Sequence, residues 1–346
     1  MNVATVAKST PQAAPELVCP AGSLPALKAA VDHGADCVYL GLRDATNARN
    51  FAGLNFDEAA IASGIAHAHA KGAKVFMALN TYPQAANPAP WRSAMDKAVD
   101  LGVDAVILAD PGLMQYAVQR HPQLRLHLSV QGSATHADAI ELMKEQFGIR
   151  RVVLPRVLTL AEIARICANV SVEVEVFGFG SLCVMAEGRC LLSSYATGDS
   201  PNNKGVCSPA HAVRWEETNG RMDARLNGIL IDRYAPGENA GYPTLCKGRF
   251  DVGEDENYYA IEEPTSLNTL ELLPQLVKAG VRAIKIEGRQ RSPAYVAQVT
   301  QVWREAIDQC MALPHRYAPK TQWMARLDQV AEGQQHTLGA YHRPWK

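Results

Sequence analysis

Short apolar runs alternate with amphipathic segments along most of the chain. Runs rich in β-branched residues predict eight strands, at residues 17–19, 38–40, 75–79, 105–109, 124–130, 152–154, 172–177 and 283–286. Helical patterns cover residues 24–33, 56–70, 91–101, 111–120, 267–279 and 293–310. Because repeated strand-then-helix units favour a closed parallel barrel, we expect an α/β fold, a (β/α)8 TIM-type barrel. An open doubly wound sheet is the alternative.

The seventh unit carries a long insertion. About 90 residues separate its apolar run from the next helical pattern, far more than an ordinary loop contains, and they include four of the eight cysteines. Loops that follow barrel strands lie at the C-terminal face, where active sites are built. We therefore expect a barrel at 16–312, with the cysteine-bearing insertion at 178–266 over its mouth. A disordered leader is expected at 1–15 and a C-terminal wrap at 313–346.

Polar residues recur on one face of three predicted strands. These residues are Arg125, His127, Ser129 and Gln131, then Glu173 and Glu175, and finally Lys285 and Glu287. Barrel strands turn their apolar face to the helices, so the polar sets should point into the lumen. Unpaired charges there cost several kcal/mol, so we expect ion pairs. The set forms either a structural polar layer or a floor for a polar substrate, and the pattern leaves both open.

Composition and charge narrow the class of protein. Hydrophobic residues make up 47% of the chain, charged residues 20%, and the formal net charge is −1. A chain so near neutrality creates no general attraction for nucleic acid or anionic membrane. It has no stretch of eighteen apolar residues that could span a bilayer, and no apolar secretory segment is visible. We expect a cytoplasmic protein, whose cysteines serve as thiols or metal ligands rather than disulfides.

Four cysteines of the insertion are candidate metal ligands. Cys183, Cys190, Cys207 and Cys246 are separated by six, sixteen and thirty-eight residues. Structural zinc usually takes closely spaced cysteine pairs, whereas wide spacing within one irregular segment suits a [4Fe–4S] cluster better. The spacing alone also leaves open a zinc site or no metal site. Of the other four cysteines, Cys19 and Cys37 open or close predicted strands, and Cys167 and Cys310 lie in helical patterns. All four read as small buried hydrophobes.

The junction after the eighth strand is a candidate anion site. Ser292 and Pro293 mark a helix start, so Arg289 and Arg291 would lie beside a helix N-terminus at the barrel mouth. These arginines could equally pair with local carboxylates. The candidate substrate-binding residues are Arg289, Arg291, Lys285, Glu287, His127 and Gln131. The chain contains no C-x3-C-x2-C, H-E-x-x-H or G-x-S-x-G motif, which weighs against S-adenosylmethionine radical chemistry and hydrolysis.

Several segments resemble a known family, the collagenase-like "peptidases" of unassigned mechanism. They are Cys19-Pro20-Ala21-Gly22, Tyr39-Leu40-Gly41-Leu42, Phe177-Gly178-Phe179-Gly180-Ser181-Leu182-Cys183, Glu187-Gly188-Arg189-Cys190, Tyr242-Pro243-Thr244-Leu245-Cys246-Lys247-Gly248-Arg249 and Lys285-Ile286-Glu287-Gly288-Arg289. Further segments resemble its ubiquinone-biosynthesis branch: Ser193-Ser194-Tyr195, Glu262-Glu263-Pro264-Thr265-Ser266-Leu267-Asn268 and Leu338-Gly339-Ala340-Tyr341-His342.

The resemblance implies a cofactor, a partner and a reaction. In that branch a [4Fe–4S] cluster is held by cysteines that fall on Cys183, Cys190, Cys207 and Cys246. Its members act in a heterodimer with a UbiV-type paralogue, and a lipid-carrier accessory protein is a further implied partner. The reaction is the oxygen-independent hydroxylation of a ubiquinone ring precursor, with prephenate as the oxygen donor. Other members hydroxylate RNA bases. Near-zero net charge counts against that alternative, and we expect no appended basic domain. A peptidase, as the family name suggests, is a further alternative.

Overall fold

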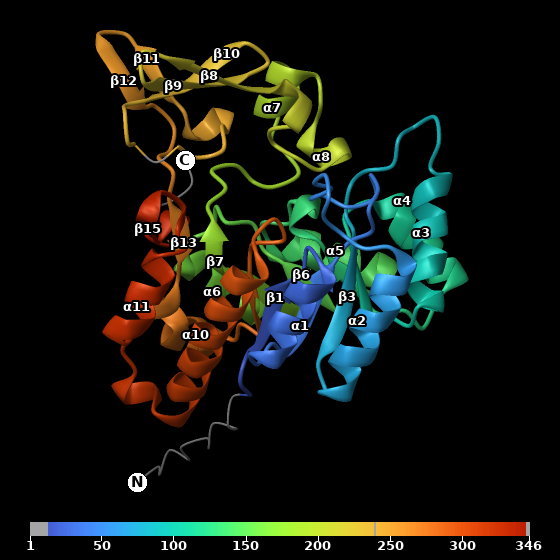
Figure 1. Cartoon of the computed structure of the whole chain (residues 1–346). Coiled ribbons are helices and arrows are strands. Elements are labelled where there is room, and N and C mark those ends of the chain that lie inside the picture. The colour runs from blue at the N-terminus through green and yellow to red at the C-terminus, as the bar shows by residue number, and fades with distance from the viewer. Residues whose placement is uncertain (1–12, 239, 344–346) are drawn as a thin grey trace.

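Eight parallel strands close into a barrel in the computed structural model, which describes residues 13–238 and 240–343 (Figure 1). The strands are β1 (Glu16–Pro20), β2 (Cys37–Leu40), β3 (Lys74–Leu79), β4 (Ala105–Leu108), β5 (Leu126–Leu128), β6 (Arg151–Val153), β7 (Glu173–Ser181) and β14 (Ala283–Ile286). They pair in this order, and β14 pairs with both β1 and β7, which closes the ring. The predicted (β/α)8 barrel is confirmed, and each predicted run contains a strand.

A helix follows each barrel strand and covers the outside of the ring. The helices are α1 (Leu24–Asp32), α2 (Glu58–Ala70), α3 (Ala89–Asp100), α4 (Pro111–Arg120), α5 (Ala137–Phe147), α6 (Leu160–Asn169), α9 (Leu273–Ala279) and α10 (Pro293–Ala312). The prediction gave no bounds for helices α5 and α6, although local signals mark them. Thr159 and Glu162 form a capping box at the start of α6, and Gly148 ends α5 in the left-handed conformation.

Apolar side chains fill two separate spaces. The larger core lies between strands and helices and includes Leu40, Met77 and Trp303. A smaller cluster lies inside the ring and includes Tyr39 and Phe76. This division follows from the two-residue period of a strand, which sends alternate side chains to opposite faces.

Strand β7 extends beyond its predicted end and recruits two more strands. β13 (Ser266–Asn268) pairs antiparallel with its last residues, and β15 (His336–Thr337) pairs parallel with β13. The helix expected at 267–279 is therefore wrong at its start. The chain runs through β13 and a 3-10 turn, η4 (Leu270–Leu272), before α9 begins at Leu273. Pairing with the protruding end of β7 satisfies backbone groups that a helix would otherwise satisfy internally.

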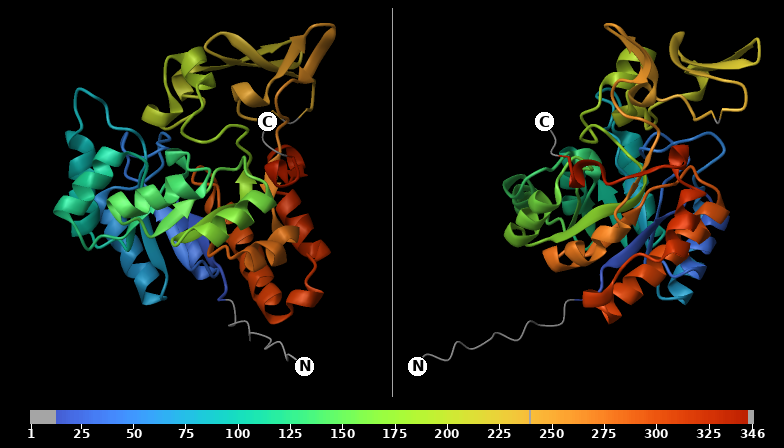
Figure 2. Two further views of the ribbon diagram at one scale, coloured as in Figure 1. Left: turned by 180° about the vertical axis from the view of Figure 1, so that it is seen from behind. Right: turned by 90° about the vertical axis from the view of Figure 1, so that its left-hand side faces the viewer.

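The insertion stands over the end of the barrel opposite the start of β1 (Figures 1 and 2). It contains a three-stranded antiparallel sheet, a two-stranded hairpin and short helices. Its elements are α7 (Leu192–Thr197), α8 (Pro201–Lys204), η2 (Ala210–Ala212), β8 (Val213–Thr218), β9 (Arg221–Leu226), β10 (Ile229–Tyr234), η3 (Leu245–Lys247), β11 (Arg249–Val252) and β12 (Asp255–Tyr259). The insertion thus lies at the C-terminal face, as predicted.

The C-terminal residues run back along the barrel to this face. Their elements are η5 (Pro314–Arg316), α11 (Thr321–Asp328), η6 (Glu332–Gln334), β15 and η7 (Gly339–Tyr341), and α11 contacts α10. Most of the predicted leader, residues 1–12, lies outside the described residues. Within residues 13–238 and 240–343, no helix has the length and apolar character needed to cross a bilayer.

Candidate functional site

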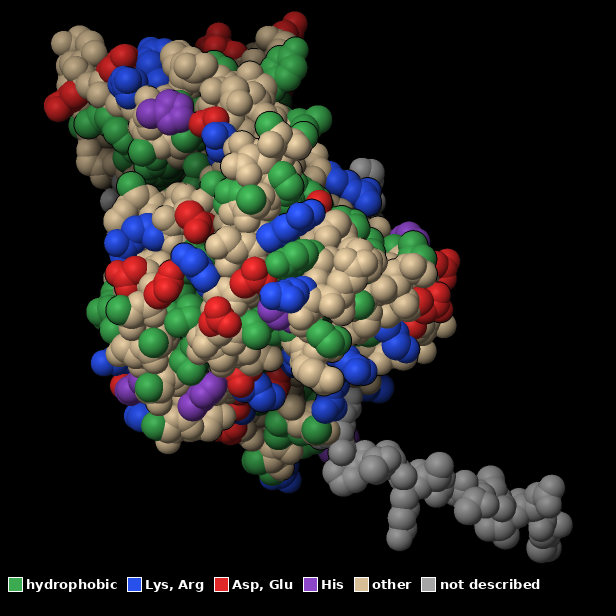
Figure 3. Space-filling view, turned by 90° about the vertical axis from the view of Figure 1, so that its right-hand side faces the viewer, with side chains coloured by type: hydrophobic (Ala, Val, Ile, Leu, Met, Phe, Trp, Pro, Cys, Tyr) green, Lys and Arg blue, Asp and Glu red, His purple; other side chains and the backbone are tan. Residues whose placement is uncertain are grey.

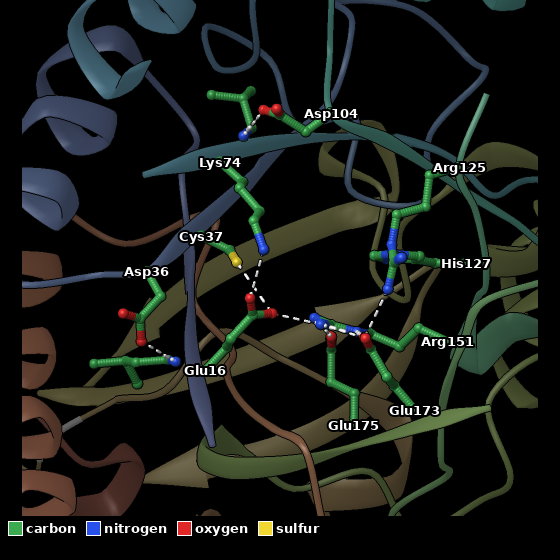
Figure 4. Close-up of polar contacts among 12 residues, drawn as sticks. Glu16, Asp36, Cys37, Lys74, Asp104, Arg125, His127, Arg151, Glu173 and Glu175 are labelled. Atoms are coloured by element: carbon green, nitrogen blue, oxygen red, sulfur yellow. Dashed lines mark hydrogen bonds and ion pairs between the residues drawn. The ribbon is translucent and has the colours of Figure 1, made fainter. Parts of the chain in front are cut away.

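A network of charged side chains closes the N-terminal end of the barrel (Figure 4). At its centre Arg151, the first residue of β6, donates to Glu173 through Nε at 2.8 Å and to Glu175 through Nη1 at 3.1 Å. Its Nη2 also donates to Glu16. Lys74 lies 2.7 Å from Glu16. A buried arginine is thus met by three carboxylates, which offsets the cost of removing its charge from water.

The ion pairs expected in the lumen are confirmed. Arg125 lies 2.8 Å from Glu173, and Lys285 lies 2.7 Å from Glu175. Glu287 differs, because it sits at the mouth and pairs with neither Lys285 nor Arg125. Arg151 was not identified from the sequence, because a single charged residue before a short apolar run does not produce an alternation of polar and apolar positions. Its neighbours in the network, Glu16 and Lys74, were missed for the same reason.

His127 is the least satisfied member of this polar layer. Its ring packs edge-on against Phe76, with 4.8 Å between ring centroids, and its Nε2 accepts a hydrogen bond from Arg125 at 3.0 Å. Burial and the positive charge of Arg151 hold the pKa of His127 well below its usual value, so the ring is neutral. Its Nδ1 is buried without a hydrogen-bond partner among the described residues. The carboxylates of this layer all have cationic partners, which favours its structural interpretation.

Arg289 lies at the C-terminal end of the barrel, where it is hydrogen-bonded to the loop after β2. Its Nη1 donates to Asn47 Oδ1 at 3.0 Å, and its Nη2 donates to the Ala48 carbonyl at 2.8 Å. Burial lowers the pKa of Arg289 to about 10. Its Nε is buried without a partner in the described structure. Both ends of the guanidinium fork are therefore occupied by the protein itself.

The remaining candidate residues of the mouth are not gathered in one place. Glu287 accepts a hydrogen bond from the Ser181 N–H at 3.3 Å and lies 3.9 Å from Arg49 Nε. Gln131 is buried in the turn after β5, and its Oε1 has no partner among the described residues. Arg291 lies instead over the ring of Tyr295 in α10, 5.0 Å from its centroid. Arg289 and Glu287 are thus neighbours at the mouth, whereas Arg291 contacts its own helix.

The first two cysteine segments are anchored to loops of the barrel mouth. Cys183 follows β7 closely, and Cys190 follows a turn that contains Glu187. The buried Arg156 joins these segments, because it pairs with Glu187 at 2.7 Å and donates to the Ser181 carbonyl. Glu187 is held from its other side, where its carbonyl accepts a bond from Ser133 Oγ at 2.5 Å.

The third segment, which carries Cys207, packs against the loop after β2. Gly205 approaches this loop so closely that an added Cβ would lie 2.8 Å from the Asn47 carbonyl oxygen. Its φ of +88° also requires the left-handed region. The hydroxyl of Ser208, next to Cys207, donates to the Pro243 carbonyl at 2.5 Å. That bond ties the third segment to the fourth.

The fourth segment is fixed by a three-membered polar cluster. Lys247, adjacent to Cys246, is 6% exposed and lies 2.6 Å from Glu332 and 3.1 Å from Ser181 Oγ. Ser181 Oγ in turn donates to Glu332 at 2.9 Å. We call these three residues the Lys247–Glu332–Ser181 cluster. It joins the fourth segment, the end of β7 and the C-terminal wrap.

The four thiols of these segments influence one another. Burial and the nearby thiols of Cys183, Cys207 and Cys190 raise the pKa of Cys246 to about 12. Burial, followed by the charge of Glu187, raises the pKa of Cys183 to a similar value. All eight cysteines are free. No three His, Cys, Asp or Glu side chains of the described ranges are arranged to hold a metal ion, so the thiols are neighbours that do not converge on one point.

Two hollows flank the cysteine segments. A cavity of about 560 Å³ is lined by Arg156 and Cys183 on one side and by Glu262 and Arg343 on another. A second, apolar groove of about 430 Å³ lies beside Cys190. Two of its lining residues are unusually exposed for their size, with Leu191 at 69% and Tyr195 at 97%.

Comparisons with known proteins identify the family and several relatives of this chain. The model of peptidase family U32 matches residues 22–344. The tRNA hydroxylation protein P1 of Bacillus subtilis strain 168 is 31% identical over 320 residues, covering 92% of this chain and 68% of that protein. The tRNA hydroxylation protein P of Escherichia coli K12 is 34% identical over 318 residues, covering 86% and 69%. The solved structure of the U32 peptidase Mk0906 is 16% identical, with a TM-score of 0.42, covering 51% and 72%.

Proposed function

The chain belongs to peptidase family U32, and we propose that it is the iron–sulfur subunit of an oxygen-independent hydroxylase acting on the ubiquinone ring precursor. Hydroxylation is supported by the names of relatives that share about a third of its residues. The ubiquinone substrate is supported by the segments that resemble UbiU-type members, such as Ser193-Ser194-Tyr195. We place the protein in the cytoplasm.

The four anchored cysteine segments carry this proposal. The insertion brings four thiols together, and burial, with a contribution from a neighbouring thiol, raises the pKa of Cys183, Cys190 and Cys246. Four such thiols form a donor set suited to iron. A single zinc ion draws its sulfurs to about 2.3 Å from one centre, whereas a four-iron cube binds each thiolate at a different corner. We therefore propose that Cys183, Cys190, Cys207 and Cys246 hold a [4Fe–4S] cluster. When bound, the cluster would supply one-electron transfer, since four thiolates leave no open iron corner.

We further propose that the chain works in a heterodimer with a UbiV-type paralogue. The apolar groove beside Cys190 supports a protein partner, because exposed aromatic and aliphatic side chains grouped on one surface mark interaction sites. Tyr195 and Leu191 are the most exposed of these side chains. Prephenate is the proposed oxygen donor, and a lipid-carrier accessory protein would present the precursor.

RNA base hydroxylation by the same chemistry is the second candidate, because five relatives carry tRNA hydroxylation in their names and another is a 23S rRNA 5-hydroxycytidine synthase. Nucleic-acid binding rests on clustered basic side chains. On the face drawn in Figure 3, Lys and Arg side chains are interspersed with Asp and Glu. A peptidase, the alternative suggested by the family name, has less support because the sequence contains none of the hydrolytic motifs sought.

A deletion strain and an anaerobic purification test the proposal together. We expect the purified chain to contain iron and acid-labile sulfide and to elute with a paralogous chain. We also expect the deletion strain to lose ubiquinone formed without O2 while its tRNA and rRNA hydroxylation, read by mass spectrometry, stays normal. Missing base hydroxylation with normal ubiquinone would instead establish the RNA function.

A further inference from the structure

The cavity beside Cys183 is built from four distant parts of the chain. Arg156 comes from the loop after β6, and Cys183 opens the insertion. Glu262 lies at the end of the insertion, and Arg343 lies in the C-terminal wrap. The volume of about 560 Å³ lies within the range of small-molecule sites. A cysteine of the proposed cluster thus forms part of a cavity wall.

We propose that this cavity binds a small carboxylate with an apolar carbon body. The inference rests on the proposed function and deepens it, because it assigns a site to the small acid that the reaction consumes. The argument uses the charges and the apolar surface of the cavity wall.

Arg156 presents a fixed cationic edge to this cavity. Its Nε pairs with Glu187 at 2.7 Å, its Nη1 donates to the Ser181 carbonyl, and its guanidinium lies 4.3 Å from the centroid of the Phe177 ring. No hydrogen bond to Nη2 is formed within the described residues, and that nitrogen is not among their buried unpartnered atoms. The side chain is therefore held in place with one donor left for a ligand.

A second cation closes the cavity from the C-terminal wrap. Arg343 is 62% exposed in its side chain and pairs with Glu262 at 2.5 Å. His342 lines the same wall. Apart from His342, the lining carries two positive charges and one negative charge. An anion that displaces Glu262 from Arg343 would meet two guanidinium groups. Arginine is the side chain best suited to hold a carboxylate through paired hydrogen bonds.

The rest of the wall is apolar and suits the carbon body of a small acid. Leu182 and Val184 flank Cys183, Val157 follows Arg156, and Ile261 lies beside Glu262. Small-molecule sites commonly combine such apolar surface with a few convergent polar groups. Arg289 offers no comparable site, because Asn47 and Ala48 occupy its fork.

The test uses two substitutions that should change affinity in opposite directions. Prephenate binding to the anaerobically purified full-length chain is measured by calorimetry. Arg343→Ala removes a cation and leaves Glu262 unpaired, so the dissociation constant should rise about tenfold or more. Glu262→Gln frees Arg343 for the ligand, so the constant should fall about two- to fivefold. Arg316→Ala, the matched control in the same wrap, should leave it unchanged.

The outcomes separate the site from the proposed function. Weaker prephenate binding in both Arg343→Ala and Glu262→Gln, or no change in either variant, would overturn the cavity as the site. A larger rise of the dissociation constant in Arg289→Lys than in Arg343→Ala would also overturn it. If prephenate does not bind while 4-hydroxybenzoate binds more weakly to Arg343→Ala and more tightly to Glu262→Gln, the cavity is a carboxylate site and prephenate is the wrong donor. Failure of both acids to bind overturns the cavity, while anaerobic ubiquinone in the deletion strain still decides the proposed function. Thermal melting confirms that each variant is folded.

Discussion

At the N-terminal end of the barrel, Arg151 is surrounded by three carboxylates, whereas at the C-terminal end several buried polar atoms have no partner. Gln131 Oε1, Glu187 Oε2 and Arg289 Nε are such atoms within the described residues. At the N-terminal end the neutral His127 Nδ1 also lacks a partner among the described residues, but the charged groups there are paired. That end therefore resembles a structural layer, and the mouth retains hydrogen-bonding capacity around charged side chains that a ligand, cluster or water could use. This division of labour is typical of TIM barrels, in which stability resides at one face and chemistry at the other.

The largest expected effect is the loss of the cluster from the mouth. Cys183→Ala should remove most of roughly four iron and four sulfide per chain, because the set loses one of four thiolates. Iron and sulfide are measured after anaerobic purification. Cys167→Ala is the matched control and should retain both, since Cys167 lies in α6. Stoichiometric zinc in the wild-type protein would contradict the cluster assignment.

Arg151→Met tests the other end of the comparison. The change removes one of the two cationic partners of Glu175, which is 1% exposed and keeps Lys285. The cost should therefore be at most the roughly 3–5 kcal/mol of a fully broken buried pair. Urea denaturation should show this loss in the free energy of unfolding. Arg125→Met, at a side chain 39% exposed, should cost under about 1 kcal/mol. Iron per folded chain should not change in either variant. A loss of iron in Arg151→Met would contradict the claim that the N-terminal end of the barrel contributes stability alone.

Arg289→Ala tests whether Arg289, at the barrel mouth, binds the ligand or only holds the loop after β2. Because Arg289 is bonded to Asn47 and Ala48, its removal should destabilise the loop after β2 by about 1–3 kcal/mol. Prephenate affinity should stay within about twofold of the wild-type value, since neither end of the fork is free for the ligand. Denaturation and calorimetry on the same preparation give both values. A large loss of affinity with unchanged stability would restore Arg289 as a ligand-binding residue.

The smallest expected effect is a change in acid sensitivity at the N-terminal end. Burial would raise the pKa of Glu16, but hydrogen bonds from Arg151 and Lys74 outweigh it and lower the pKa from 4.5 to about 2. A lowered pKa in the folded state stabilises the protein above pH 4.5, and this contribution is lost as the pH falls toward 2. Glu16→Gln should therefore be less stable than wild type at neutral pH, and the difference should shrink below pH 4.5. Denaturation midpoints measured between pH 3 and 7 check this, and a constant difference would contradict it.

The sequence predicted well what repeats along the chain and poorly what is assembled from distant parts. Alternation identified the strands and placed Glu175 and Lys285 in the lumen, because a strand has a strict two-residue period. Arg156 and Arg343 produce no such local pattern. Their roles depend on contacts with Glu187 and Glu262, which lie 31 and 81 residues away in sequence. The anion site was accordingly sought at Arg289, whose helix-start signal is local.

The Lys247–Glu332–Ser181 cluster has a consequence for the order in which the protein matures. All four candidate ligands leave the ribosome before β14, the strand that closes the barrel, and Glu332 follows later still. Until then Lys247 lacks the carboxylate of Glu332, and the segment with Cys246 lacks its anchor to the C-terminal wrap. A nascent chain thus exposes its thiols before it can arrange them. If the cysteines hold the proposed cluster, loading of iron and sulfide belongs after translation of residue 332. Any delay between the two steps then leaves four unprotected thiols open to oxidation.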